Sequence, residues 1–286
     1  MKREKALAEV HLAVLLFGLA GLFGKWLTLS PPAIVLGRVV LASLTLAVVL
    51  GFSRQKLWPR NSKDLALFAL MGLVLAVHWV TFFKSIQVST VAVGLLAYST
   101  FPFFTAFLEP LWLRERFDNR SVLLSLVCLA GVFLIIPRLE MSNAVMKGVL
   151  WGLLSGLSFS VLTILNRIMT RTYSSLQTAF QQDFFAGIFL WPLVLCSPPA
   201  LSAGDVGLLA VLGIVCTAGA HTLFIDGLKG IGARAASLIS ALEPVYGVIL
   251  AFAFLREVPA PQTLLGGALI LAAVAAVSLR KTGSLR

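Results

Sequence analysis

The chain alternates between long apolar runs and short polar breaks. Each run approaches the roughly 20 residues that a helix needs to cross a bilayer, and none has the strict alternation of a membrane β-barrel strand. The breaks carry turn or charge signals, such as Ser30-Pro31-Pro32 and Arg114-Glu115-Arg116. The pattern predicts an all-α membrane protein with ten transmembrane helices, over residues 6–27, 31–51, 64–83, 89–113, 119–137, 146–168, 176–196, 204–227, 232–255 and 260–279.

Composition agrees with this pattern. Hydrophobic residues make up 59% of the chain, charged residues 12%, and mean hydropathy is +0.96, whereas soluble domains carry about 25% charged residues. These values exclude a disordered chain and an ordinary cytosolic enzyme. The three cysteines, Cys128, Cys196 and Cys216, lie far apart in apolar runs, so we expect neither a metal site nor a disulfide framework. No cofactor is expected either.

The basic residues predict how the chain is oriented. Lysines and arginines outnumber acidic residues by 23 to 12, which in a soluble protein suggests a nucleic-acid partner. If the N-terminus is cytoplasmic and ten spans alternate, 17 basic residues fall inside, five fall outside and Arg38 lies within a span. This bias follows the positive-inside rule. We therefore predict a multi-pass protein of the bacterial inner membrane with both termini in the cytoplasm and no nucleic-acid partner.

The two halves of the chain resemble each other at a shift of 142 residues. Phe101-Pro102-Phe103 falls on Glu243-Pro244-Val245, and Leu113-Arg114-Glu115 falls on Leu255-Arg256-Glu257. Each half holds five predicted helices, and because five is odd, the second copy has the opposite orientation in the membrane. We therefore expect two inverted five-helix repeats, at residues 1–140 and 141–286. Such repeats are typical of secondary transporters, which bind solute near the midplane between the two copies.

These motifs resemble the drug/metabolite transporter superfamily, specifically its ten-helix EamA-type branch. The resemblance covers about residues 6–280 and is strongest over 235–245 and 255–257. One departure is Leu124-Ser125, which stands where the second half has Gly266-Gly267. The resemblance implies a 5+5 inverted fold, a central cavity and alternating-access movement of small organic solutes. It does not specify the solute.

Ionisable side chains inside a span are costly, so each needs a reason. Glu243 lies near the middle of the ninth span, directly before Pro244, which removes a backbone donor and tends to kink the helix. Ser237, Ser240, Glu243 and Tyr246 recur at intervals of three on roughly one helix face. We interpret this face as a wall of the substrate cavity, with Glu243 as the coupling candidate that binds a proton or a solute amine. The alternative is a structural carboxyl group bonded to a neighbouring helix.

The first half contributes further candidates for the cavity. Tyr98 and Phe101 lie on the corresponding face of the fourth span, where an aromatic ring could stack on a ligand. His78 and His221, in the third and eighth spans, could carry protons near neutral pH. The alternatives are plain helix packing for the aromatic rings and hydrogen-bonded structural roles for the histidines.

Arg38 in the second span and Asp183 in the seventh are the remaining candidates. Each lies about 10 Å deep from opposite sides of a core about 30 Å thick, so we do not expect a direct ion pair. Packing against backbone carbonyls is the simpler interpretation of Arg38, and contact with a solute carboxylate is the alternative that places it among the cavity candidates.

These observations favour a secondary transporter over a membrane enzyme or a receptor. Ser155 lacks the spacing of a serine-protease nucleophile, and residues 227–232 lack the Gly-Lys-Ser/Thr of a P-loop. We expect an exporter of small organic metabolites such as amino acids, working by alternating access. Its expected partners are the solute, the lipid bilayer and protons as a candidate coupling ion.

Overall fold

The computed structural model describes residues 3–113, 123, 126–127, 130–134, 142–224, 226–227, 239–240 and 242–278. Every element within these ranges is helical, which confirms the predicted all-α class. The predicted span 119–137 and the first part of span 232–255 fall largely outside the described residues. The helices are α1 (Arg3–Trp26), α2 (Pro31–Phe52), α3 (Ser62–Val88), α4 (Val91–Tyr98), α5 (Phe101–Leu113), α7 (Ala144–Met169), α8 (Ser175–Leu195), α9 (Ala203–Ala210), the π-helix η1 (Val211–Gly219), α11 (Glu243–Leu255) and α12 (Pro261–Ser278).

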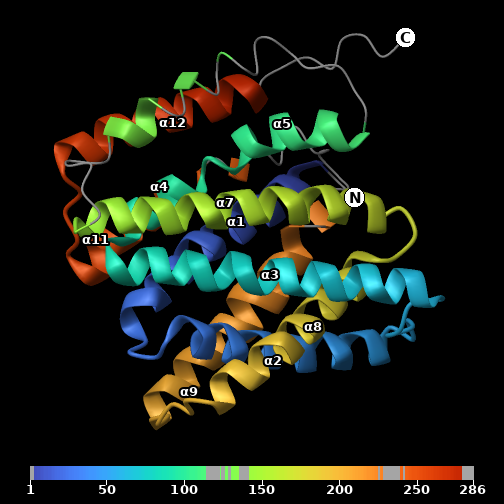
Figure 1. Ribbon diagram of the computed structural model, residues 1–286. Helices are drawn as coiled ribbons and strands as arrows, with labels where there is room; N and C mark the ends of the chain where they lie inside the picture. The colour runs from blue at the N-terminus through green and yellow to red at the C-terminus, as the bar shows by residue number, and fades with distance from the viewer. Residues whose placement is uncertain are drawn as a thin grey trace, which may run out of the picture.

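Helices from the two halves of the chain interleave in the bundle. Helix α3 packs against both α7 and α8, and α2 packs against α8 and η1. On the other side, α1 packs against α11, and α4 packs against α7 and α11 (Figure 1). First-half helices therefore have their main neighbours in the second half, so any cavity at the centre is built by both halves.

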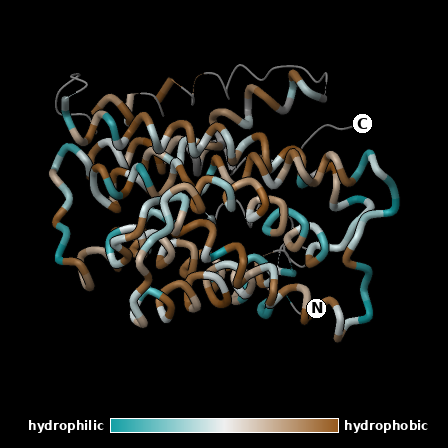
Figure 2. Tube along the Cα trace, turned by 60° about the horizontal axis from the view of Figure 1, so that its bottom comes forward, coloured by the Kyte–Doolittle hydropathy of each residue, from teal (hydrophilic) through white to brown (hydrophobic). Residues whose placement is uncertain are grey.

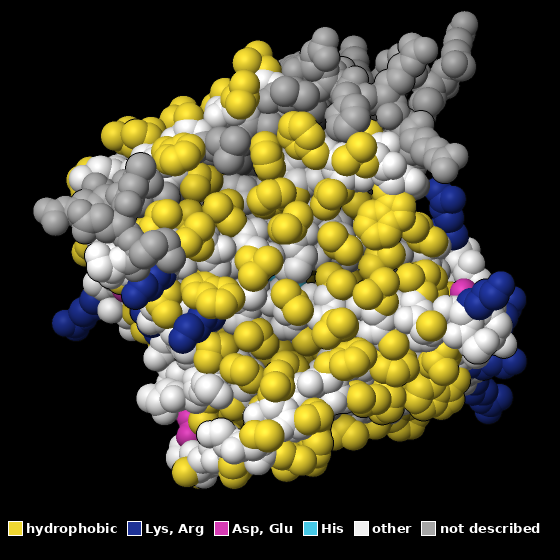
Figure 3. Space-filling view, in the orientation of Figure 1, with side chains coloured by type: hydrophobic (Ala, Val, Ile, Leu, Met, Phe, Trp, Pro, Cys, Tyr) yellow, Lys and Arg dark blue, Asp and Glu magenta, His cyan; other side chains and the backbone are white. Residues whose placement is uncertain are grey.

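The surface fits a membrane environment. Six helices of the described chain are long and apolar enough to cross a bilayer, namely Arg3–Trp26, Pro31–Phe52, Ser62–Val88, Val91–Trp112, Ala144–Asn166 and Ala203–Phe224. Hydrophilic residues gather at the turns (Figure 2). On the face in Figure 3, apolar side chains cover the middle, and lysines and arginines lie at the two ends. Large apolar side chains such as Leu44, Val48 and Leu193 are exposed where lipid tails would lie.

Two predicted continuous spans are interrupted. The span predicted over 89–113 consists of α4 and α5, with Ser99 and Thr100 as a turn between them, and α11 begins only at Glu243. The starts of α5 and α11 coincide at the 142-residue shift, and each helix has proline as its second residue. Proline lacks the N–H that would continue a preceding helix, but is tolerated in a first turn. The prolines therefore begin new helices, whereas the sequence suggested only a kink.

At one end of the bundle, the loops around α2–α3 and α7–α8 are tied together. Tyr173 donates a hydrogen bond of 2.5 Å to the Asp64 carboxylate and accepts one of 3.1 Å from the Arg60 backbone. Burial and then the bond to Asp64 raise the pKa of Tyr173 above its ordinary value. Ser174 adds a 2.6 Å bond to Gln55. These contacts fix the N-terminal end of α8 against the C-terminal end of α2.

The α1–α11 contact needs a glycine at position 18. A Cβ atom at Gly18 would lie 2.9 Å from the Gly247 backbone nitrogen and 3.0 Å from the Glu243 carbonyl oxygen. We expect Gly18→Ala to lower the free energy of unfolding by about 1–3 kcal/mol, because neither backbone can yield easily. The measurement is thermal unfolding of the purified protein in detergent. Gly51→Ala is the matched control, since a Cβ there meets nothing within 4 Å; equal effects of the two changes would contradict this packing.

Candidate solute-binding cavity

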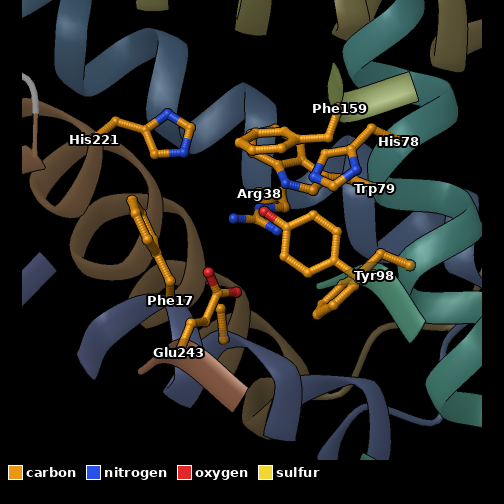
Figure 4. Close-up of a pocket in the computed structure, with 10 residues that line it drawn as sticks. Phe17, Arg38, His78, Trp79, Tyr98, Phe159, His221 and Glu243 are labelled. Atoms are coloured by element: carbon orange, nitrogen blue, oxygen red, sulfur yellow. The ribbon is translucent and has the colours of Figure 1, made fainter. Parts of the chain in front are cut away.

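A buried cavity of about 60 Å³ lies where the two halves of the chain meet. It combines one arginine, one glutamate and two histidines with a largely aromatic wall (Figure 4). Its lining comes from α1, α2, α3, α4, α7, α11 and the helical residues after η1, and consists of Phe17, Ala20, Arg38, His78, Trp79, Phe82, Tyr98, Phe159, His221 and Glu243.

The cavity is small compared with pockets that bind organic ligands. At roughly 10–15 Å³ for each water position, the space holds only a few water molecules. Pockets that bind organic ligands are usually several times larger, on the order of 300–1,000 Å³. The observed cavity is therefore smaller than a pocket that typically holds an organic ligand.

Arg38 supplies a buried positive charge to one side of the cavity. Its side chain is only 2% exposed, and its Nε donates a 3.0 Å hydrogen bond to the Thr217 hydroxyl. The guanidinium carbon lies 3.8 Å from the centre of the Trp79 ring, where the ring quadrupole attracts a cation. Among the described residues, no acidic oxygen lies within 4.0 Å of Arg38. The guanidinium is therefore held in place without a direct counter-ion, which suits it to an anionic ligand group.

The π-helix η1 presents the partner of Arg38. The Thr217 hydroxyl donates a 2.7 Å hydrogen bond to the carbonyl of Leu212, five residues earlier, and the hydroxyl oxygen of Thr217 accepts from Nε of Arg38. π-Helical turns occur frequently at functional sites. The sequence did not reveal Thr217, because an apolar segment with one threonine gives no sign of π-helical geometry.

His78 lies beside Tyr98 in the wall formed by α3 and α4. Its Nδ1 lies 3.0 Å from the Ser155 carbonyl oxygen and 2.9 Å from the Ser155 hydroxyl, which in turn donates to the His78 carbonyl. Because a carbonyl oxygen only accepts, a hydrogen bond to it requires Nδ1 to carry a hydrogen.

Aromatic rings form the rest of the wall. Tyr98 stacks on Phe101 with ring centres 5.5 Å apart, and its ring lies 5.3 Å from that of His78 and 5.4 Å from that of Phe159. Phe101 does not line the cavity itself. It supports Tyr98 from behind, so the two residues act as one stacked unit.

Glu243 brings a carboxyl group to the cavity from the side of α11. Figure 4 shows the carboxyl of Glu243 and the guanidinium of Arg38 directed into the same space from different helices. Glu243 lies in the first turn of α11, where the helix dipole favours a negative charge. The cavity therefore offers an acidic group and a basic group that are not paired with each other.

Five of the candidate residues from the sequence share the cavity. Arg38, His78, Tyr98, His221 and Glu243 line it, and the His221 ring packs 5.4 Å from that of Phe17.

The expected polar face of the ninth span is divided. Tyr246 points toward His11, with its hydroxyl 3.2 Å from Nδ1. Ser240 is half-buried and not part of the lining, and Ser237 lies outside the described residues. The predicted face required one continuous helix through all four predicted positions of the ninth span, but α11 begins only at Glu243.

Half of the lining was not predicted. Phe17, Ala20, Trp79, Phe82 and Phe159 are apolar residues within apolar helices. In such a sequence an aromatic residue that lines a cavity is not distinguishable from one that packs against a neighbouring helix or faces lipid. A signal was present only for Trp79 and Phe82, which lie one and four residues after His78 and so close to it on α3.

Comparison with known proteins agrees with this architecture. The model of the EamA-like transporter family matches residues 6–136 and 146–279. The chain belongs to the EamA-like transporter family. It is a membrane transporter and not an enzyme, and the two matched segments imply the inverted repeats predicted from the 142-residue shift. The family assignment thus confirms the ten-helix fold class and the resemblance seen in the sequence.

Individual relatives of this EamA-family transporter are distant. It is 25% identical to the uncharacterized transporter YxxF of Bacillus subtilis over 99% of this chain and 92% of the relative. It is 24% identical to the uncharacterized inner membrane transporter YicL of Salmonella typhimurium, over 96% of each chain. A solved crystal structure matches with a TM-score of 0.67 at 18% identity, covering 97% of this chain and 98% of that one. That structure supports the fold alone.

Proposed function

We propose that this EamA-family protein is a secondary transporter that exports amino acids with apolar side chains across the inner membrane by alternating access. Both termini lie in the cytoplasm, and the repeats 1–140 and 141–286 move relative to each other around the cavity. The observation that carries the proposal is the separate placement of Arg38 and Glu243 in one aromatic-lined cavity.

The charges of the cavity match those of an amino acid. An arginine guanidinium binds a carboxylate through two parallel hydrogen bonds, and an ionised Glu243 would attract an ammonium group. Burying either solute charge without a partner costs several kcal/mol, so both groups are needed to accept a zwitterion. Trp79, Phe82 and Phe159 provide apolar contacts for the side chain.

Glu243 also offers a route to proton coupling. A proton and a solute ammonium group both neutralise the same carboxylate, so they compete for it. If the proton binds from outside and the ammonium from inside, each cycle exchanges one for the other. Inward proton flow would then drive export.

The test is counterflow in proteoliposomes loaded with unlabelled amino acids. We expect accumulation of labelled phenylalanine, leucine or methionine, competition among them, and dependence on a pH gradient. If broad amino-acid screening gives neither binding nor flux, the proposed substrate class is wrong. Reversing the gradient tests the direction, because export predicts efflux when protons flow inward.

Tyr98 should contribute to affinity through its ring. We expect Tyr98→Ala to weaken solute binding about 3- to 10-fold, because an aromatic contact is worth about 0.5–1.5 kcal/mol. Tyr98→Phe keeps the ring and should bind within about twofold of the unsubstituted protein. Isothermal titration or scintillation proximity binding checks both. Unchanged affinity in the alanine variant would assign Tyr98 to packing alone.

A further inference from the structure

Helix α8 buries an unusual number of polar side chains for a membrane helix. Its residues Gln177, Thr178, Gln181, Gln182 and Asp183 are all buried. The glutamines have structural partners: Gln177 and Gln181 donate to backbone carbonyls of the loop at 57–58, and Gln182 donates a 2.7 Å bond to Asn166. Among the described residues, the Thr178 hydroxyl and the Gln181 amide oxygen still lack a partner, as do both carboxyl oxygens of Asp183, which is the ionisable residue of the group.

Asp183 is buried without a hydrogen-bond partner among the residues that the structure describes. Its side chain is 1% exposed, and neither carboxyl oxygen finds a donor in that part of the chain. An ionised carboxylate in such a place is costly unless it is paired. The observed geometry therefore fits a neutral, protonated carboxyl group, or a carboxylate that pairs with a cation in another conformation.

Arg38 is the charged group that faces Asp183. Helix α8 packs against α2 and α3, and the titratable groups on this side are Arg38 on α2, His78 on α3 and Cys216 on η1. Of these, Arg38 is the group that carries a permanent positive charge, so it is the candidate counter-ion for an Asp183 carboxylate. No nitrogen of Arg38 lies within 4.0 Å of an Asp183 oxygen, so the two groups are neighbours that are not in contact.

The helix packing places Asp183 behind the cavity. Ser174 bonds to Gln55, whereas Gly187 lies opposite Val39, with a virtual Cβ 3.6 Å from its Cγ2 atom. Helices α2 and α8 are therefore antiparallel, and Asp183 lies near the level of Ser43, about one turn beyond Arg38. Among the described residues, the Ser43 hydroxyl also has no partner. The long Arg38 side chain is the charged donor that a carboxylate at this level would need.

We propose that Asp183 is a proton-binding site that serves as the alternative counter-ion of Arg38. With solute bound, its carboxylate pairs with Arg38, and Asp183 holds a proton. When the solute leaves, the O–H bond of Asp183 breaks, the proton returns to water on the cytoplasmic side, and the new carboxylate pairs with Arg38. When solute returns, Asp183 takes a proton from water on the same side and releases Arg38 to the cavity, so Asp183 carries no proton across the membrane and coupling stays with Glu243. The buried charge stays balanced in both states, as a membrane interior requires. The solute part of this cycle rests on the proposed function; the proton site does not.

A solute-free experiment tests the proton site, because Trp79 reports where Arg38 lies. The full-length protein keeps Trp79 while its other tryptophans, Trp26, Trp58, Trp112, Trp151 and Trp191, become phenylalanine. Emission of Trp79 is recorded in lipid nanodiscs from roughly pH 5 to pH 9, the range in which buried carboxyl groups titrate. We expect a reversible transition as Arg38 leaves the ring at high pH. A protein without any transition overturns the proposal before a variant is made.

Variants then identify the group that titrates. Asp183→Asn should abolish the transition, and Asp183→Glu should move its midpoint, because both change the same proton site. Asp205→Asn, at the start of α9, is the matched control and should leave the transition in place. If the transition survives in Asp183→Asn, the proposal is overturned. If the asparagine variant does not fold, an unchanged midpoint in Asp183→Glu overturns it instead. If the protein shows no amino-acid flux but does show the Asp183-dependent transition, the proposed substrate is wrong and the proposed proton site stands.

Discussion

Transport should be lost when Arg38 is replaced by glutamine. The variant removes the positive charge that holds a solute carboxylate and leaves the carboxylate in an apolar aromatic cavity. Truncating one partner of a buried charge pair costs about 2–5 kcal/mol, which corresponds to a loss of affinity of about 30-fold or more. Counterflow in proteoliposomes and direct binding of labelled amino acid measure the effect.

Arg38→Lys is the informative companion variant. Lysine keeps the charge but lacks the planar fork that binds a carboxylate and stacks on Trp79, so we expect intermediate affinity. Thermal unfolding of both variants shows whether the fold survives the change. A folded Arg38→Gln protein that transports amino acids at the unsubstituted rate would remove Arg38 from solute binding.

Replacing Glu243 by glutamine should separate solute binding from proton coupling. The amide neither attracts an ammonium group as a carboxylate does nor exchanges a proton. We therefore expect flux driven by a pH gradient to vanish and affinity for amino acids to fall at least about 10-fold, because a charged hydrogen bond contributes about 1.5–3 kcal/mol.

The control for Glu243→Gln is a ligand without an amine. Binding of the corresponding deaminated acid should change little, because that ligand uses Arg38 and not Glu243. Unchanged pH-dependent flux in the glutamine variant would remove Glu243 from the coupling role.

The sequence predicted the architecture well, because membranes limit the choice of backbone structure. Spanning segments must satisfy their own hydrogen bonds, so long apolar runs become helices. The 142-residue shift linked Pro102 with Pro244, and the helices α5 and α11 indeed start at corresponding positions. What the shift did not reveal was that each proline marks a helix start and not a bend within one helix.

The cavity was predicted only through its polar members. Arg38, Tyr98 and Glu243 stand out because a polar group in an apolar run is costly and needs a reason. Trp79 and Phe159 carry no such penalty, so only the three-dimensional structure assigns them to the wall. The depth argument also anticipated the absence of a direct pair between Arg38 and Asp183, but not that their helices, α2 and α8, pack against each other.

The central claim is that one cavity recognises an amine and a carboxylate through different residues. Its most direct test is a competition series with leucine, its decarboxylated amine and its deaminated acid, measured on the unsubstituted protein, Arg38→Gln and Glu243→Gln. We predict that leucine binds at least about 10-fold more tightly than either analogue. In Arg38→Gln, leucine should bind no more tightly than the decarboxylated amine. In Glu243→Gln, leucine should bind no more tightly than the deaminated acid. Equal binding of all three ligands to the unsubstituted protein would contradict the account.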